Sequence, residues 1–362
     1  MSKHSNFKLI VLDSARELGE KTNIALQKIM KTKENFFFPI SSLRFSNGEA
    51  KACLDEDVRD CDLYILADVG NYSLSYLLHG SPHLMSPDEH FQDIKRVILA
   101  TSGHASHITV VMPLLYQSRQ HKRRAQESLD CACALQELER LHVNEILTFD
   151  AHDPNVSNAI PNLPFENVYP TNTILQRILE DNPSDLNELL VISPDMGAME
   201  RARYYAEMLN CDVGVFYKRR DLTKTINGKN PILEHVYMGA DVMNKTILVV
   251  DDMIASGQSM LEVAKLLKEK GAKKIFLVAT FALFTEGVSE FFDAYSNKDF
   301  QKLYVTNLSY VPEEVKRQKW YEEVDCSYAL ADIIYHMNTS CALKTKEEEK
   351  KEVLEKIETL KC

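Results

Sequence analysis

The chain has 362 residues, of which 45% are hydrophobic and 26% are charged, so wholesale disorder and collagen-like repeats are excluded. Lys and Arg number 42 against 53 Asp and Glu, which gives a formal net charge of -11. A chain this acidic is a poor candidate for binding a nucleic-acid backbone by bulk charge, so no nucleic-acid partner is expected. The length is sufficient for two domains, each with its own hydrophobic core.

The sequence predicts neither a targeting signal nor a disulfide framework, and Cys131 and Cys133 are the only cysteines close together. No apolar run approaches the roughly 20 residues that a membrane helix needs, so no membrane partner is expected. The first residues, MSKHSNFKLIVLDS, contain no signal-peptide cleavage site. The 8 cysteines form no CxxC pair, which argues against a zinc ribbon or a disulfide framework. These features predict a reduced, cytoplasmic protein.

Short apolar runs alternate with longer amphipathic segments along the chain. Strands are predicted at residues 8–12, 62–66, 108–112, 145–149, 189–192, 213–217, 246–250 and 275–280. Helices are predicted at residues 128–141, 200–209 and 260–270, the last followed by Gly271, a residue suited to a helix C-terminus. The alternation predicts βαβ units and parallel sheets covered on both faces, with ligands at the carboxyl ends of the strands.

Three prolines between Pro161 and Pro170 indicate a domain boundary. We expect an N-terminal domain over residues 1–165, a C-terminal domain over residues 166–340, and a charged helix over residues 341–362. The apolar stripe of that last helix is thin, which is typical of a surface or interface helix. It consists of Val353, Leu354, Ile357 and Leu360.

The most informative segment follows the strand predicted at 246–250. Asp251 and Asp252 come first, then a loop of small residues, then a helix start. Backbone N–H groups at a helix N-terminus, with the hydroxyls of Ser256 and Ser259, form a cradle for an anion. Two carboxylates would repel a phosphate, but they can accept hydrogen bonds from sugar hydroxyls beside it. The ATP-binding pattern GxxxxGK[ST] does not occur in the chain.

Residues 249–259 resemble the ribose-5-phosphate loop of type I phosphoribosyltransferases. With other motifs in the expected order, the chain from about Leu9 to about Ile334 resembles the ribose-phosphate pyrophosphokinase family. The resemblance implies an α/β fold of two type I phosphoribosyltransferase-type domains, each with a central, mostly parallel sheet flanked by helices, and an active site between them. It also implies Mg2+ as cofactor and a homo-oligomer, either a hexamer or a dimer-based assembly.

Two segments carry the resemblance to the family's ATP site. Arg44-Phe45-Ser46-Asn47-Gly48-Glu49 is similar to the nucleotide loop Phe-x-Asp-Gly-Glu, in which the aromatic ring can stack on adenine. The basic segment 116–124 is similar to Tyr-x-x-x-Arg-Gln-Asp-Arg-Lys, with a His where the Asp is usual. The resemblance implies that ATP binds Phe45, Asn47, Glu49, Arg119, Gln120 and His121.

Two strand ends carry the resemblance to a magnesium site. Residues 148–152 are similar to the family's Asp-Leu-His-Ala, and residues 193–198 to its Ser-Pro-Asp-x-Gly-Gly. The resemblance implies that His152 and Asp195 hold Mg2+. Magnesium binds few protein oxygens and keeps several waters, so such a small ligand set is chemically reasonable.

Lys218, Arg219 and Arg220 follow the strand predicted at 213–217, and the polar segment 221–230 is expected to be a mobile loop. The family's catalytic loop begins with Lys-x-Arg, which implies that Lys218 and Arg220 are catalytic. Preorganised cations are suited to stabilising charge on a transferring phosphoryl group.

The resemblance implies transfer of the diphosphoryl group of ATP to ribose 5-phosphate, giving 5-phosphoribosyl 1-pyrophosphate and AMP. The residues that would hold ribose 5-phosphate are Asp251, Asp252, Ala255, Ser256, Gly257, Gln258 and Ser259. A phosphoribosyltransferase that consumes phosphoribosyl pyrophosphate is one alternative, although it would not need an ATP loop. The other is a non-catalytic homologue that regulates an active synthetase. That alternative is raised by departures from the family pattern at His121, Asp153, Ala255 and Phe281.

Overall fold

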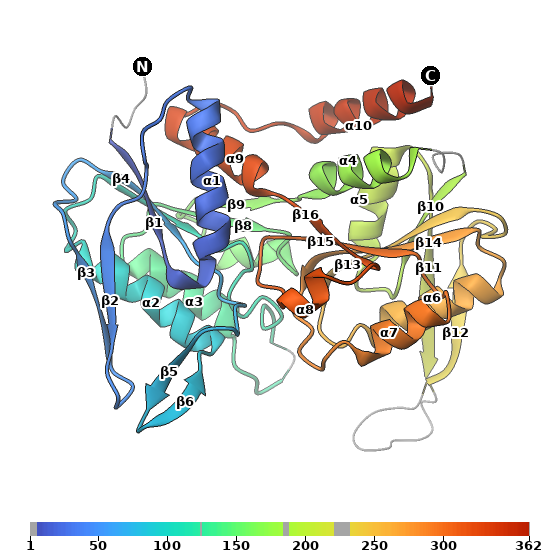
Figure 1. Cartoon of the computed structure of the whole chain (residues 1–362), viewed down its shortest axis with the longest axis horizontal. Helices are drawn as coiled ribbons and strands as arrows, with labels where there is room; N and C mark the ends of the chain where they lie inside the picture. The colour runs from blue at the N-terminus through green and yellow to red at the C-terminus, as the bar shows by residue number, and fades with distance from the viewer. Residues whose placement is uncertain (1–5, 124, 184–187, 221–231, 362) are drawn as a thin grey trace. The chain divides into compact units, whose positions relative to one another are not determined.

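The computed structural model describes residues 6–123, 125–183, 188–220 and 232–361 (Figure 1). The chain divides into two compact units. The first comprises Met1–Pro170, Asn307–Pro312 and Asp325–Leu343, and the second comprises Thr171–Thr306, Glu313–Val324 and Lys344–Cys362. The units are interleaved along the chain, whereas the domains predicted from the sequence are continuous.

The first unit is built on a five-stranded sheet in which every pair of neighbouring strands is parallel. The order is β1 (Phe7–Val11), β4 (Asp62–Leu66), β7 (His107–Val111), β8 (Glu145–Phe149) and β9 (Phe165–Val168). The four strands predicted for this region are confirmed, each within one residue at its ends. All residues of β4 are buried, as expected for a strand covered on both faces.

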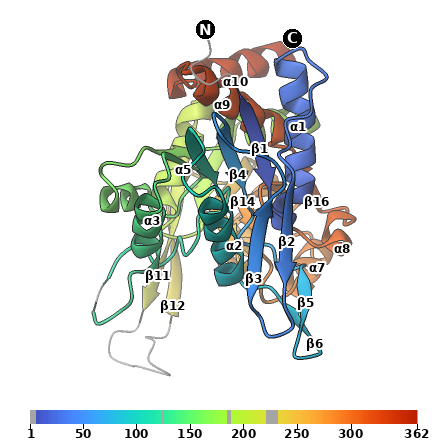
Figure 2. The same cartoon turned by 90° about the vertical axis from the view of Figure 1, so that its left-hand side faces the viewer.

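Helices cover both faces of the first sheet (Figure 2). On one face, α1 (Arg16–Ile29) packs against α9 (Ser327–Thr339), and α2 (Pro87–Ala100) and α3 (Asp130–Arg140) lie on the other. Short 3-10 turns, η1 (Asp13–Ala15) and η2 (Pro154–Ala159), follow β1 and β8. A capping box begins α2, in which Ser86 and Glu89 each accept the other's backbone N–H.

Two late segments of the chain complete this unit. Asn338 of α9 donates a hydrogen bond to the buried carboxylate of Asp62, with Nδ2 2.7 Å from Oδ2. The carboxylate of Asp68, just beyond β4, accepts from the Ser309 hydroxyl at 2.9 Å and from the Tyr310 backbone N–H at 2.7 Å. Residues 307–312 and 325–343 therefore bind the β-sheet formed by the first 170 residues.

Two β-hairpins extend from the first unit, and neither was predicted from the sequence. One consists of β2 (Ile40–Arg44) and β3 (Ala50–Leu54), and the other of β5 (Ser75–Leu78) and β6 (Ser81–Leu84). Their strands are largely exposed, so they lack the alternating apolar pattern that marks a half-buried strand. Gly48 and Gly80 lie in the two turns with φ of +91° and +80°, a conformation that favours glycine.

The second unit is built on a seven-stranded sheet, parallel except at β12. The order is β12 (Ile232–Met238), β11 (Asp212–Arg220), β10 (Leu189–Ser193), β13 (Thr246–Ile254), β14 (Lys274–Ala282), β15 (Lys302–Thr306) and β16 (Tyr321–Val324). Helices α4 (Thr171–Asp181), α5 (Met199–Leu209) and α10 (Lys346–Lys361) lie on one face of this sheet. Helices α6 (Gln258–Glu269) and α7 (Ser289–Ser296) lie on the other, with the short α8 (Glu313–Lys316) beside β16 (Figure 1).

Strand β13 is longer than the predicted strand 246–250. It continues to Ile254 because β14 is long enough to pair with it, with Met253 opposite Phe281 and Ile254 opposite Ala282. Asp251 and Asp252 therefore lie within the end of the strand rather than after it. Among the residues that the structure describes, no helix is both long enough and apolar enough to span a membrane.

The charged C-terminal segment forms α10, which is shorter than the helix expected over residues 341–362 and packs against α4 and α5. Val353 and Ile357 of its predicted apolar stripe are buried there. Tyr204 of α5 donates a hydrogen bond to Glu349, with the hydroxyl 3.4 Å from Oε2. Burial raises the pKa of the Glu349 carboxyl to about 7.

Candidate active site

The predicted nucleotide loop closes the hairpin of β2 and β3. The Phe45 N–H donates to the Glu49 carbonyl at 2.8 Å, and the Gly48 N–H to the Phe45 carbonyl at 2.9 Å. Asn47 accepts the Glu49 N–H through Oδ1 at 3.1 Å and donates to Glu49 Oε2 through Nδ2 at 3.0 Å. The Phe45 side chain is 42% exposed. The loop thus presents an exposed aromatic ring beside a hydrogen-bonded Asn–Glu pair.

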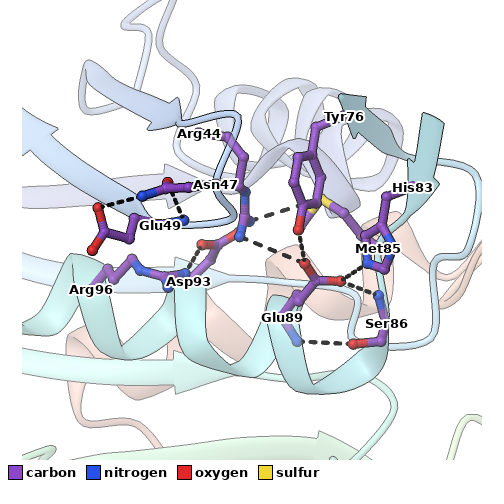
Figure 3. Close-up of polar contacts among 10 residues, drawn as sticks. All are labelled: Arg44, Asn47, Glu49, Tyr76, His83, Met85, Ser86, Glu89, Asp93 and Arg96. Atoms are coloured by element: carbon purple, nitrogen blue, oxygen red, sulfur yellow. Dashed lines mark hydrogen bonds and ion pairs between the residues drawn. The ribbon is translucent and has the colours of Figure 1, made fainter. Parts of the chain in front are cut away.

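A group of polar side chains joins this loop to α2 (Figure 3). Arg44, which directly precedes Phe45, places Nη2 2.7 Å from Asp93 Oδ2, and its guanidinium lies 5.0 Å from the centre of the Tyr76 ring. The Tyr76 hydroxyl donates to Glu89 Oε1 at 2.7 Å. Burial alone would raise the pKa of Glu89, but hydrogen bonds from the Ser86 N–H and the Tyr76 hydroxyl lower it below its usual value.

Sequence reasoning quoted Arg44 in the loop motif without giving it a role, and it missed its partners on α2 and β5. The only signal for them was Ser86-Pro87-Asp88-Glu89, a pattern typical of a helix start. That pattern predicts the helix but not which side chains face the loop.

The predicted basic segment is also held by α2. The Tyr116 hydroxyl donates to Asp88 Oδ1 at 2.7 Å, and the Tyr116 ring stacks on Phe91 with centroids 4.3 Å apart. Arg119 and Gln120 follow with exposed side chains. One helix of the first unit therefore supports both segments that the resemblance assigns to ATP.

His121 lies between the basic segment and the loop after β8. Its Nδ1 is 3.1 Å from the Ser118 carbonyl oxygen, and its ring centre is 5.4 Å from that of His152. Its Nε2 is 3.2 Å from Asp153 Oδ2, an ion-pair distance without the angle of a hydrogen bond. Burial alone would raise the pKa of Asp153, but hydrogen bonds from Asn155 and the nearby His121 and Lys122 lower it.

The predicted sugar-phosphate segment lies in the second unit, at the end of β13. Asp252 is buried and donates its N–H to Asp251 Oδ1 at 2.9 Å. Burial and the charge of Asp252 raise the pKa of Asp251 well above its usual range. Arg201 of α5 opposes this rise, and its Nη2 lies 3.9 Å from Asp252 Oδ2. Sequence reasoning missed Arg201, because its position on a predicted helix gave no sign that it faces Asp252.

Gly257 shapes the turn between β13 and α6. It has φ of +78°, and a Cβ there would lie 2.4 Å from Cζ of Phe291. Only glycine fits both the backbone conformation and the space. The turn delivers the chain directly into α6, whose first backbone N–H groups are suited to binding a phosphate.

Asp195 lies in the same unit, after β10, which neighbours β13. Its Oδ1 accepts the N–H groups of Gly197 at 2.8 Å and of Ala198 at 3.2 Å, so the carboxylate is held in place ahead of α5. A fixed carboxylate at a strand end fits the ligand chemistry of magnesium, which binds through one or two protein carboxylates, substrate phosphates and water. The other predicted ligand, His152, belongs to the first unit.

Over the described ranges of the chain, no three His, Cys, Asp or Glu side chains form a metal-binding cluster.

The backbones of Lys218 and Arg220 belong to β11, where they pair in register with His235 and Ile232 of the antiparallel β12. The side chains of these two predicted catalytic residues, and the predicted loop 221–230, lie outside the described residues.

Two family models match separate parts of the chain. Residues 170–309 match the phosphoribosyl transferase domain, and residues 7–141 match the N-terminal domain of ribose phosphate pyrophosphokinase. The ribose-phosphate pyrophosphokinase of Pyrococcus abyssi is 33% identical over 210 residues, which cover 58% of this chain and 67% of that protein. That of Nostoc sp. is 27% identical over 278 residues, which cover 76% of each protein.

A solved structure agrees with these matches at the level of the fold. The phosphoribosylpyrophosphate synthetase from Mycobacterium smegmatis superposes with a TM-score of 0.74 at 21% identity, over 92% of this chain and 99% of that chain. The predicted fold class, two α/β domains of the phosphoribosyltransferase type, is confirmed. The chain therefore belongs to the ribose-phosphate pyrophosphokinase family.

Proposed function

We propose that the protein transfers the β,γ-diphosphoryl group of ATP to the 1-hydroxyl of ribose 5-phosphate, giving 5-phosphoribosyl 1-pyrophosphate and AMP. The observation that supports this most directly is the end of β13, where two adjacent carboxylates precede a glycine turn into α6. Family membership adds the expectation of an ATP site in the first unit, where an exposed Phe45 lies at the hairpin turn.

In this proposal, ribose 5-phosphate binds to the second unit. Asp251 and Asp252 accept hydrogen bonds from the ribose hydroxyls, and the backbone at the start of α6 holds the 5-phosphate. Ser256 and Ser259 add hydroxyl donors. The full phosphate loop comprises Ala255, Ser256, Gly257, Gln258 and Ser259.

ATP binds through residues of the first unit in this proposal. Phe45 stacks on the adenine, and the Asn47–Glu49 pair supplies polar contacts to its edge. Arg119 and Gln120 contact the polyphosphate. His121 belongs to the same group, where its contacts with Ser118 and Asp153 orient it.

In the reaction, the 1-hydroxyl oxygen bonds to the β-phosphorus and loses its proton, and the bond from that phosphorus to the α,β-bridging oxygen breaks to release AMP. Lys218 and Arg220 stabilise the charge on the β-phosphoryl oxygens and the leaving oxygen. His152 and Asp195 would hold Mg2+, which neutralises polyphosphate charge when bound. The remaining catalysis is positioning of the two substrates.

The test is incubation of the full chain with MgCl2, ATP and ribose 5-phosphate, with AMP and phosphoribosyl pyrophosphate both quantified. Equal amounts of the two products, dependent on ribose 5-phosphate, are expected. AMP formed without phosphoribosyl pyrophosphate would mean hydrolysis of ATP and would overturn the proposal. The same reactions analysed by sedimentation would test whether the protein assembles as a homo-oligomer, either a hexamer or a dimer-based form.

A non-catalytic synthetase-associated homologue is the second candidate, favoured by the departures at His121, Asp153, Ala255 and Phe281. It predicts no product in this assay but measurable binding to an active synthetase. A phosphoribosyltransferase would instead consume phosphoribosyl pyrophosphate when a nucleobase is supplied, and would not respond to ATP.

A further inference from the structure

We propose that Arg44 is a positioning residue that fixes the nucleotide loop against α2, so that Phe45, Asn47 and Glu49 present a preformed surface to ATP. The inference rests on the proposed function, because it concerns the same nucleotide loop. Arg44 is not among the residues assigned to either substrate. It acts through the loop that follows it.

Arg44 is the last residue of β2, and its side chain is only 15% exposed. Its Nη2 donates to Asp93 Oδ2 at 2.7 Å, and its Nη1 lies 3.9 Å from Glu89 Oε1. Both carboxylates belong to α2, one helical turn apart. A guanidinium can engage two separate acceptors at once, which a single ammonium group does less well. Arg44 therefore joins the base of the loop to two successive turns of one helix (Figure 3).

The second hairpin holds the other side of the loop. The His79 backbone N–H donates to the Ser46 carbonyl at 2.7 Å. A Cβ at Gly48 would lie 3.2 Å from Cδ1 of Leu78, so the turn and β5 are already in close contact. Tyr76 of the same strand contacts Arg44 through its ring and Glu89 through its hydroxyl. The loop is thus held between α2 and the β5–β6 hairpin.

The hairpin of β2 and β3 does not pack closely along its whole inner surface. A cavity of about 180 Å³ lies between its inner surface, the end of β1 and α2. Ser42, Ala50 and Ala52 line it from the hairpin, with Met85 and His90 on the opposite side. Where side chains do not interlock, the position of a hairpin depends on its few strong contacts. The charge-assisted hydrogen bond between Arg44 and Asp93 is one such contact.

The contacts of Arg44 with Asp93 and Glu89 are together called the clamp. The charges around the clamp are balanced in the folded protein. Asp93 accepts from Arg96 as well, with Nη1 2.6 Å from Oδ1, and His83 lies 3.1 Å from Glu89. Removing Arg44 leaves Asp93 paired with Arg96, so α2 keeps a partner for that carboxylate while the loop loses its anchor. Arg96 therefore provides a matched control, since it shares Asp93 with Arg44 but contacts only its own helix in the clamp.

The test compares Arg44→Gln, Arg44→Lys and Arg96→Gln with the unmodified chain. Affinity for a non-hydrolysable ATP analogue is measured by calorimetry, and KM and kcat are measured in the product assay. We expect Arg44→Gln to weaken nucleotide affinity about 10-fold, the size of a lost charged hydrogen bond. Arg44→Lys should lie between Arg44→Gln and the unmodified chain. In the Arg44 variants, the KM for ribose 5-phosphate and kcat should each change by less than about 2-fold. In Arg96→Gln, the nucleotide affinity should also change by less than about 2-fold.

A double substitution separates positioning from a direct contact. If Arg44 acts through the loop, Arg44→Gln should have little further effect once Phe45→Ala has removed the stacking ring. The proposed role of Arg44 would be wrong if Arg44→Gln and Phe45→Ala weakened nucleotide affinity additively. It would also be wrong if Arg44→Gln and Arg96→Gln weakened nucleotide affinity equally. If Arg44→Gln fails to fold by thermal melting, the comparison of Arg44→Lys with Arg96→Gln decides the question.

The calorimetric measurement also keeps the two proposals distinct. An unmodified chain that binds the ATP analogue but makes no phosphoribosyl pyrophosphate overturns the proposed reaction and still tests the clamp. A chain that forms product while Arg44→Gln retains full nucleotide affinity overturns the clamp alone. A chain that binds no ATP analogue overturns both.

Discussion

Nε2 of His121 lies 3.2 Å from Oδ2 of Asp153, and both residues depart from the pattern of the family. His121 stands where an Asp is usual, and Asp153-Pro154 replaces the usual Gly-Gln. The two side chains that depart from the expected pattern are therefore neighbours in the fold. An Asp at residue 121 would place a second carboxylate against Asp153, whereas the imidazole can pair with it.

The first prediction follows from this contact. His121→Asp should lower the free energy of unfolding by about 1–2 kcal/mol, because it sets two carboxylates against each other in a half-buried site. Adding Asp153→Ala should restore most of that loss. Urea unfolding of the two single variants and the double variant measures the coupling. Additive effects would mean that the two side chains do not interact in solution.

The second prediction concerns catalysis. Lys218→Ala should lower kcat by about 100-fold or more and leave the KM for ribose 5-phosphate nearly unchanged, as expected for a group that stabilises transition-state charge. Steady-state kinetics measures both constants. Lys265→Ala, at an exposed position of α6, is the matched control and should leave kcat and the KM for ribose 5-phosphate unchanged. A rise confined to the KM values would make Lys218 a substrate-binding residue instead.

The third prediction concerns Arg201. Burial and Asp252 raise the pKa of Asp251, and Arg201 opposes them. The ionised carboxylate of Asp251 accepts hydrogen bonds from sugar hydroxyls, so affinity for ribose 5-phosphate should increase as pH rises through the titration of Asp251. Arg201→Gln raises the pKa of Asp251 further, so the midpoint of that increase should move to higher pH.

Calorimetric dissociation constants for ribose 5-phosphate, measured against pH for both proteins, provide the test. The sugar phosphate itself takes up a proton near neutral pH, so only the difference between the two curves is informative. Superimposed curves would mean that Arg201 does not influence the ionisation of Asp251.

The fourth prediction compares two glycines with similar backbone angles. Gly257→Ala and Gly287→Ala both place a Cβ at positive φ, +78° and +85°, which costs about 1 kcal/mol each. Only the Cβ at residue 257 meets a neighbour, the Phe291 ring. Gly257→Ala should therefore lose clearly more stability and also weaken ribose 5-phosphate binding. Equal thermal shifts for the two variants would contradict the close packing of this turn.

The fifth prediction uses Glu349. The pKa of the Glu349 carboxyl is about 7 in the folded protein against a usual value of 4.5. Between these pH values the carboxylate is ionised in the unfolded chain, and it takes up a proton when the protein folds. Its contribution to stability therefore falls as pH rises from 4.5 to 7. Glu349→Gln should raise the melting temperature at pH 8 relative to the unmodified chain, by the equivalent of about 1 kcal/mol, and have little effect at pH 4.5. If Glu349→Gln raised the melting temperature equally at pH 8 and at pH 4.5, the ionisation of the Glu349 carboxyl would not be the cause.

The sequence predicted the elements that carry strong periodicity and missed those that depend on distant partners. Buried strands such as β4 have continuous apolar runs, and all eight predicted strands were found. The β2 sequence ISSLR is mostly exposed and has no such run, so its hairpin was missed. Where β13 ends depends on β14, which no local pattern in the β13 sequence reveals.

The same limit applies to the site. Motifs identified which segments matter, because each motif is continuous in the sequence. The partners of Arg44 lie on a helix more than forty residues away, and Asp153 is 32 residues from His121. Such contacts follow only from the folded arrangement. The assignments to ATP, ribose 5-phosphate, magnesium and catalysis stay predictions until the experiments above are done.

The two late segments that complete the first unit also set an order of events during synthesis. A nascent chain that ends at Pro170 has all five strands of the first sheet. It still lacks Ser309 and Tyr310 beside Asp68, and Asn338 beside Asp62. The face of α1 that packs against α9 in the folded protein also lacks its packing partner at that stage. The first unit to be translated is therefore unable to reach its native state until residue 339 has left the ribosome, well after the strands of the second sheet have been made.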